Sequence, residues 1–206
     1  MKILLLADHA EPMLWEHLDR RRLEGVELIL SCGDLPAEYL SFLTCFTNAP
    51  ILYIHGNHDG KYENKPPEGC ICIEDMVYIH NGVRILGLGG SMRYNQGPHQ
   101  YSEKDMMRRI RRLRFRLWRT KGIDILLTHA PAYQLGDDSG FAHRGFEAFL
   151  HVIDQYAPKL MAHGHVHQSY RYDFQRVRQR GNTQVVNAYG FYIFELDTSA
   201  KDEKGL

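Results

Sequence analysis

The sequence predicts an α/β protein with either one mixed sheet or two sheets. Short apolar runs alternate with helical patterns in the first part of the chain, and closely spaced apolar runs follow later. The 206 residues are enough for one domain with a sizeable core. With 44% apolar and 24% charged residues, the composition is typical of a soluble globular protein.

The predicted strands are short runs of apolar residues, many of them branched, bounded by polar or glycine residues. They are Ile3–Leu6, Val26–Leu30, Ile51–Ile54, Val77–Ile79, Val83–Leu88, Ile123–Leu127, Leu160–Ala162, Val185–Val186 and Tyr192–Leu196. Asn81-Gly82 separates two of these runs, and this dipeptide strongly indicates a β-hairpin turn.

Helical patterns lie between other strands, at Met13–Leu23, Ala37–Phe46, Glu103–Arg119 and Phe146–Tyr156. Pro12 and Pro36 stand where the first turn of a helix tolerates proline. Ser102 and Asp105 have the spacing of a capping box at the start of the third helix.

Polar side chains with metal-ligating or acid–base chemistry follow five of the predicted strands. They are Asp8, Asp34, the run Asn57-His58-Asp59, His129, and the pair His165 and His167. Ligand sites of open α/β sheets form at the carboxyl ends of the strands, so we expect these groups to converge on one cleft. Each group alone is more often a turn or a strand cap, but turns do not readily explain five in order.

The donor set favours particular metals. Carboxylate and amide oxygens combined with several imidazoles suit Mn, Fe or Zn better than Ca or Mg. Gly33, Gly56 and Gly164 each adjoin a predicted ligand, where glycine permits a sharp turn and a close backbone approach. The sequence therefore predicts a transition-metal site.

In this order the motifs resemble the calcineurin-like metallophosphoesterase superfamily, whose pattern is D-x-H, GD-x-x-D, GNH-[DE], a lone His and GH-x-H. The matching segments run through almost the whole chain: Asp8-His9-Ala10, Gly33–Ala37, Gly56–Asp59, His129 and Gly164–His167. The resemblance implies one domain over residues 1–206, built as a four-layer α/β/β/α sandwich. It also implies a phosphoesterase that hydrolyses a phosphomonoester or phosphodiester by attack of a metal-bound hydroxide.

The resemblance also assigns roles to residues of this chain. Two divalent ions would share Asp34. Asn57, His129 and His165 would complete the shell of one ion, and Asp8 and His167 would bind the other. The catalytic pair would be His58, which would protonate the leaving oxygen or stabilise the phosphoryl oxygens, and Asp59, which would orient it.

The sequence departs from the family pattern at two positions. At Ala10 the pattern has a histidine ligand. At Ala37 it has an aspartate that is usually not a ligand, so this departure matters less. In an extended chain residue 10 would face the same side as Asp8, so one metal position is expected to be weakened. His9, Glu11 or water could fill the gap. A non-catalytic or nucleic-acid-directed protein with an incomplete two-metal site is therefore the alternative hypothesis.

Two further features leave alternatives open. His143 could contact substrate, or it could be a solvated or capping residue. The segment Arg108–Lys121 is rich in arginine and fits a helix with a solvated basic face, or a landing surface for nucleic acid or another polyanion. The equal totals of 25 basic and 25 acidic residues argue against a global attraction to polyanions.

The expected setting is the cytoplasm. The first apolar run is too short for a signal peptide, no run has membrane-spanning length, and the four cysteines lack a zinc-ribbon or redox spacing. The expected partner is a phosphate-ester substrate, and no association with a membrane is expected. The sequence leaves the oligomeric state open.

Overall fold

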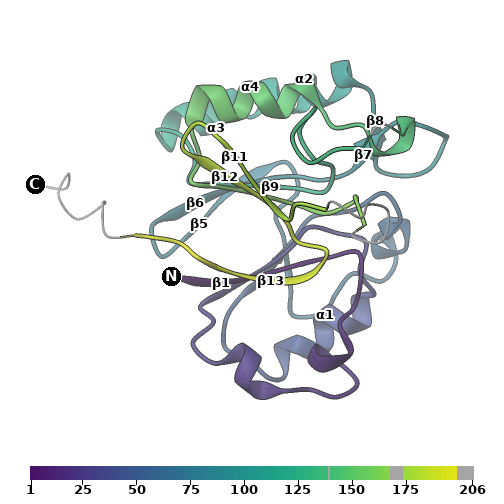
Figure 1. The fold of residues 1–206 in the computed structure, drawn as a ribbon, viewed down its shortest axis with the longest axis vertical. Coiled ribbons are helices and arrows are strands. Elements are labelled where there is room, and N and C mark those ends of the chain that lie inside the picture. The colour runs from purple at the N-terminus through teal and green to yellow at the C-terminus, as the bar shows by residue number, and fades with distance from the viewer. Residues whose placement is uncertain (139, 168–173, 199–206) are drawn as a thin grey trace, which may run out of the picture.

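Two sheets stacked face to face form the centre of the molecule. The computed structural model describes residues 1–138, 140–167 and 174–198 (Figure 1). The first sheet has the strand order β13-β1-β2-β3-β4 and the second has the order β11-β12-β10-β9-β6-β5. Helices α2, α3 and α4 cover the second sheet, and α1 lies under the first, which confirms the four-layer α/β/β/α sandwich.

The strands of the first sheet are β1 (Lys2–Ala7), β2 (Leu28–Ser31), β3 (Ile51–Tyr53), β4 (Ile71–Cys72) and β13 (Gly190–Glu195). Those of the second are β5 (Met76–His80), β6 (Val83–Leu88), β9 (Ile125–Thr128), β10 (Leu160–His163), β11 (Val177–Arg180) and β12 (Thr183–Asn187). Strands β7 (Ser91–Met92) and β8 (Gln100–Tyr101) form a separate small pair.

The central strands of both sheets run parallel to their neighbours and are buried on both faces. In β1, Ile3 and Leu5 face the core between the sheets, while Leu4 and Leu6 face the layer of α1. This two-sided burial explains why the strands are continuous apolar runs instead of alternating patterns.

The helices are α1 (Ala37–Thr44), α2 (Glu103–Arg112), α3 (Arg114–Arg119) and α4 (Glu147–Tyr156), with 3₁₀ turns η1 (Pro12–Leu14), η2 (Arg20–Leu23), η3 (Asp59–Glu63) and η4 (Phe141–His143). The capping box at Ser102 and Asp105 is confirmed. The hairpin at Asn81-Gly82 is confirmed as well, since it joins the antiparallel strands β5 and β6. None of the helices among the described residues is long and apolar enough to cross a membrane.

Two helix predictions are wrong in extent. Met13–Leu23 forms only η1 and η2, because the Asp19 side chain accepts the backbone N–H of Arg21 and starts a new turn there. Glu103–Arg119 divides at Leu113, where the backbone N–H bonds the Ile110 carbonyl three residues back instead of four. Strands β4, β7, β8 and β11 were not predicted, and three of these have only two residues.

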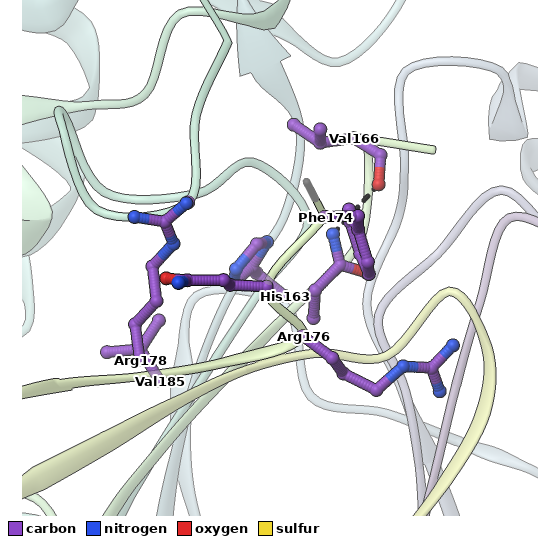
Figure 2. A pocket seen from close by; sticks show the side chains of 9 residues that line it. His163, Val166, Phe174, Arg176, Arg178 and Val185 are labelled. Carbon is purple, nitrogen blue, oxygen red and sulfur yellow. Dashed lines mark hydrogen bonds between the residues drawn. The ribbon is translucent and has the colours of Figure 1, made fainter. Parts of the chain in front are cut away.

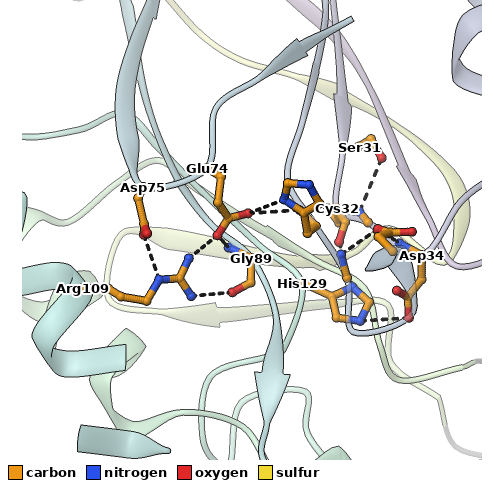
Figure 3. A network of polar contacts seen from close by, with 12 residues as sticks. Ser31, Cys32, Asp34, Glu74, Asp75, Gly89, Arg109 and His129 are labelled. Carbon is orange, nitrogen blue, oxygen red and sulfur yellow. Dashed lines mark hydrogen bonds and ion pairs between the residues drawn. The ribbon is translucent and has the colours of Figure 1, made fainter. Parts of the chain in front are cut away.

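Arg109 is an exception to the solvated basic face expected for this segment, because it is buried (Figure 3). Its guanidinium pairs with Glu74, bonds Asp75 at 2.8 Å, and donates to the Gly89 carbonyl at 2.8 Å. Burial opposes ionisation of Glu74, but hydrogen bonds from His55 and the charge of Arg109 outweigh it and lower the pKa of Glu74 from 4.5 to about 2. Helix α2 is thus tied to the ends of β4 and β6 by charge as well as by apolar packing.

We expect Arg109→Met to lower the free energy of unfolding by roughly 3–5 kcal/mol, because the largely buried carboxylate of Glu74 loses its cation. Arg112→Met, a matched change at an exposed position of the same helix, should alter it by less than about 0.5 kcal/mol. Urea unfolding followed by circular dichroism measures both.

The penalty of Arg109→Met should also depend on pH. Since the folded-state pKa of Glu74 is depressed, its stabilisation is present above pH 4.5 and is lost as the pH falls toward about 2. The difference between the parent and Arg109→Met should therefore shrink below pH 4.5. A difference that stays constant with pH would contradict the ion-pair explanation.

Candidate metal centre

The predicted ligands gather where strands of both sheets end. Asp8 follows β1, and Asp34 follows β2. Asn57 follows β3. From the second sheet, His129 follows β9 and His165 follows β10. The two sheets present these ends at one edge of the sandwich, where Asp8, Asp34, Asn57 and His165 line one pocket. His129 is fully buried beside Asp34.

Three of these residues have left-handed backbone conformations that non-glycine residues rarely adopt. The φ angles are 61° at Asp8, 57° at Asp34 and 69° at His165. Each residue comes at or just after the end of a strand, where the chain turns sharply away from the sheet. Backbone strain of this kind is characteristic of functional sites, because the surrounding structure must hold it in place.

The adjoining glycines are required by close packing. A Cβ at Gly56 would overlap the Asp34 carboxylate, and a Cβ at Gly164 would overlap the carboxylate of Asp8. Gly33 has φ 94° and lies against the backbone of Gly56. The loops that carry Asp8, Asp34, Asn57 and His165 therefore fit together only with these glycines.

The tightest group of donors is Asp34, His129 and His165. One ligand atom from each lies within 4.8 Å of the other two, a spacing that could hold a metal ion. The Nε2 atom of His129 is 3.2 Å from Asp34 Oδ2 and 3.0 Å from Asn57 Oδ1. The predicted set of Asp34, Asn57, His129 and His165 is thus brought together by the fold.

The electrostatics of this group fit a cation. Burial alone would lower the pKa of His129, but the Asp34 carboxylate outweighs it and raises the pKa to about 10. Burial likewise opposes ionisation of Asp34, yet His129 and the backbone N–H of His58 hold its pKa well below the usual range. The environment therefore stabilises positive charge at the place where the donors converge.

Hydrogen bonds orient both histidines, and Figure 3 shows the contacts of His129. His129 donates from Nδ1 to the Cys32 carbonyl at 2.8 Å, which directs Nε2 toward Asp34. His165 donates from Nε2 to the Ala142 carbonyl at 2.8 Å, which leaves Nδ1 as its free lone pair. Burial lowers the pKa of His165 to about 3, so its imidazole is neutral. A carbonyl bond that fixes the opposite ring nitrogen is the usual support of a histidine ligand.

Asp8 and His167 form a looser second group. His167 Nε2 is 3.7 Å from Asp8 Oδ1, and the carboxylate of Asp8 also accepts the backbone N–H of His165 at 2.9 Å. The His167 ring lies 4.9 Å from that of Tyr189, and His9 stacks on Tyr189 at 6.0 Å. The structure therefore places one compact donor group beside a more open one.

The expectation that Ala10 faces the same side as Asp8 was wrong, because it required an extended chain. The positive φ of Asp8 bends the chain at that residue and ends the alternation of sides. Ala10 packs against the apolar cluster on the outer face of the first sheet, and Glu11 lies against Gly190. A weaker second metal position remains a prediction. It is supported by the longer distance between the side chains of Asp8 and His167.

The structure gives Asp59 a different contact from the expected one. Its Oδ2 accepts the backbone N–H groups of Asp34 and Gly56, each at 2.7 Å, and within the described residues it has no hydrogen bond to His58. Burial and the nearby charge of Asp34 raise the pKa of Asp59 to about 6. Asp59 therefore holds together the loops that carry Asp34 and Asn57, whereas the His58 side chain is exposed.

These groups open into a pocket of about 270 Å³. Tyr94 and His143 also line it: the Tyr94 hydroxyl accepts the Asn57 amide at 3.2 Å, and the His143 ring lies 5.2 Å from that of His165. His143 thus lies at the pocket, as one of its two interpretations requires. Tyr94 was missed because it follows the short strand β7, which the sequence did not reveal.

His163, also absent from the predicted site, lines a different pocket from the candidate ligands (Figure 2). It lines a separate cavity of about 10 Å³, large enough for about one water molecule, with Val166, Arg176 and Arg178. Burial lowers the pKa of His163 to about 4, so this imidazole is neutral. It is a neutral core histidine.

A family model described as calcineurin-like phosphoesterase matches residues 1–169, and the chain belongs to this family. The crystal structure of TT1561 from Thermus thermophilus is 19% identical with a TM-score of 0.62, covering 91% of this chain and 88% of that one. This likeness supports the fold alone. A structure described as a novel archaeal phosphodiesterase is 16% identical with a TM-score of 0.47, covering 98% and 96%. No curated protein matches the sequence.

We expect Mn²⁺ titration of the chelated protein, followed by calorimetry, to show one tight step and one weaker step. His165→Ala should weaken the tight step, because it removes a donor of the compact group. His167→Ala, the matched change two residues away, should weaken only the other step. Even loss of a residue that supports a ligand commonly costs roughly 10–100-fold in metal affinity. Two equal steps in the parent protein would contradict the asymmetry.

Proposed function

We propose that this chain is a metal-dependent phosphoesterase that hydrolyses a phosphomonoester or a phosphodiester. The observation that carries the proposal is the convergence of Asp34, His129 and His165 within 4.8 Å, with Asp34 and His165 lining an open pocket. Membership of the calcineurin-like phosphoesterase family supports the same conclusion. The described residues offer no competing group of three or more metal-ligating side chains of this kind.

The proposed cofactors are two divalent transition-metal ions, Mn, Fe or Zn. Asp34, Asn57, His129 and His165 would hold one, and Asp8 and His167, with Asp34 shared, would hold the other. When bound, such ions polarise phosphoryl oxygens and lower the pKa of water near them. The mixed oxygen and imidazole donors fit this class of metal better than Ca²⁺ or Mg²⁺.

His58 is the proposed proton donor to the leaving oxygen. Its backbone N–H binds Asp34 Oδ1 at 2.8 Å, which fixes its position beside the donor group, while its side chain stays exposed. The residue also lines a second pocket of about 340 Å³, which shares Asp34 and His58 with the first. A residue between two pockets suits proton transfer, with the phosphoryl group on one side and the leaving alcohol on the other.

The second pocket has a mixed lining that suits an organic leaving group. Leu35, Pro36 and Tyr62 supply apolar surface, and Lys61 and Lys65 supply positive charge. Lys65 is paired with Glu38 at 2.7 Å, so Lys61 is the cation more available to an anionic substituent. We propose that the alcohol half of the ester binds here.

Chelation tests the function directly. Protein treated with a strong chelator should lose hydrolysis of generic aryl phosphate mono- and diesters, because the phosphoryl oxygens lose their cations. Activity should return with Mn²⁺ or another transition metal. Activity that survives thorough chelation would refute the metal mechanism, and metal binding without turnover of any ester would favour the non-catalytic alternative.

His58→Ala should lower kcat by roughly 10²–10⁴-fold, the usual contribution of a positioned general acid. Metal content should stay at the level of the parent, because the His58 contact to Asp34 uses the backbone N–H, which alanine retains. Elemental analysis beside steady-state kinetics separates the two effects. Loss of metal together with activity would instead make the His58 ring a ligand.

A further inference from the structure

The outer face of α2 and α3 carries a concentration of positive charge that the candidate metal centre does not use. The exposed cations are Arg108, Arg111, Arg112, Arg114, Arg116, Arg119 and Lys121. The sequence contains no acidic residue between Asp105 and Asp124. We call this face, residues 108–121, the basic helical surface; it belongs to the upper helical layer in Figure 1.

Most of these cations are not neutralised within the protein. Arg108 pairs with Asp105 at 2.9 Å. For the other six, no ion pair to an acidic side chain occurs in residues 1–138, 140–167 and 174–198. The surface is therefore a local positive patch on a chain whose formal net charge is zero.

Two large aromatic side chains stand among these cations. Phe115 is 67% exposed and Trp118 is 73% exposed, and their ring centroids are 5.8 Å apart. Leu113 and Leu117 on the other side of α3 are buried and attach the helix to the second sheet. Single exposed apolar residues are ordinary, but neighbouring exposed Phe and Trp rings within an arginine cluster are characteristic of a binding surface.

The combination of exposed cations and exposed aromatic rings indicates which kind of partner fits this surface. Six uncompensated cations favour a polyanion, and open aromatic faces favour flat rings that can stack on them. Duplex nucleic acid hides its base faces inside the stack, whereas single strands expose them. A membrane surface fits less well, because α3 has six residues and the apolar side of α2 and α3 is already packed on the protein.

We propose that the basic helical surface binds single-stranded nucleic acid, with arginines on the phosphates and Phe115 and Trp118 stacked on unpaired bases. The surface needs no metal and none of the proposed catalytic residues. The proposal therefore stands or falls separately from the phosphoesterase function.

Binding is measured with fluorescently labelled single-stranded oligonucleotides of mixed sequence, by anisotropy, on chelated protein across a range of salt concentrations. Affinity should fall steeply with salt, with a slope of about 0.7 per phosphate contact. Arg116→Glu should reduce both affinity and slope. Arg21→Glu, the same charge change at an exposed residue of η2, controls for net charge and should change the affinity far less.

The aromatic contribution is tested by Trp118→Ala, which should weaken single-strand binding by roughly tenfold with little change in salt slope. Quenching of tryptophan fluorescence on binding should disappear in this variant, since Trp15 lies in another layer. Unfolding midpoints of all variants should match the parent, because the altered side chains are exposed.

Three outcomes would overturn the proposal. The first is no oligonucleotide binding at low salt. The second is equal affinity for duplex and single strands that Trp118→Ala does not change. The third is binding to phosphatidylserine vesicles, dependent on Trp118, that single-stranded oligonucleotides do not displace.

Discussion

The candidate site depends above all on the buried imidazole of His129. This residue ends a strand of the second sheet, yet its Nδ1 donates to the carbonyl of Cys32, which follows a strand of the first sheet. The bond crosses from one sheet to the other and fixes which ring nitrogen faces Asp34 and Asn57. Shifting one sheet against the other would break this bond and move the donor groups apart. The packing of the two sheets therefore fixes the geometry of the site.

A second link extends from the outer helices to the same edge. Arg109 of α2 pairs with Glu74, and the other oxygen of that carboxylate accepts the backbone N–H of His55 at 3.1 Å. His55 directly precedes the segment that carries Asn57 and His58. The helical layer therefore supports the site through the buried carboxylate of Glu74. Because a buried charge is costly to leave unpaired, Arg109 and His55 are held in fixed positions around it.

Helices α2 and α3 consequently serve two different environments. Their inner side is buried against the second sheet and includes one arginine, while their outer side presents exposed arginines and exposed aromatic rings. The apolar spacing explains the inner side, since residues three or four apart share one face of a helix. It does not explain the outer aromatics Phe115 and Trp118, which are exposed and belong to the surface proposed to bind single-stranded nucleic acid.

Short-range sequence patterns were enough to predict the strand ends, the order of the candidate ligands and the local turns. Asp8, Asp34, Asn57, His129 and His165 were predicted because period, strand length and motif spacing are properties of short segments. The hairpin at Asn81-Gly82 and the capping box at Ser102 were predicted for the same reason, since each depends on backbone groups only a few residues away.

Contacts between segments distant in sequence became visible only in the folded structure. It placed Arg109 inside the protein, bent the chain at Asp8 so that Ala10 packs outward, and gave Asp59 the backbone of Asp34 as its partner. These features depend on a buried charge, a bend in the backbone or a hydrogen bond to another loop. The periodicity of a short segment carries no information about such contacts.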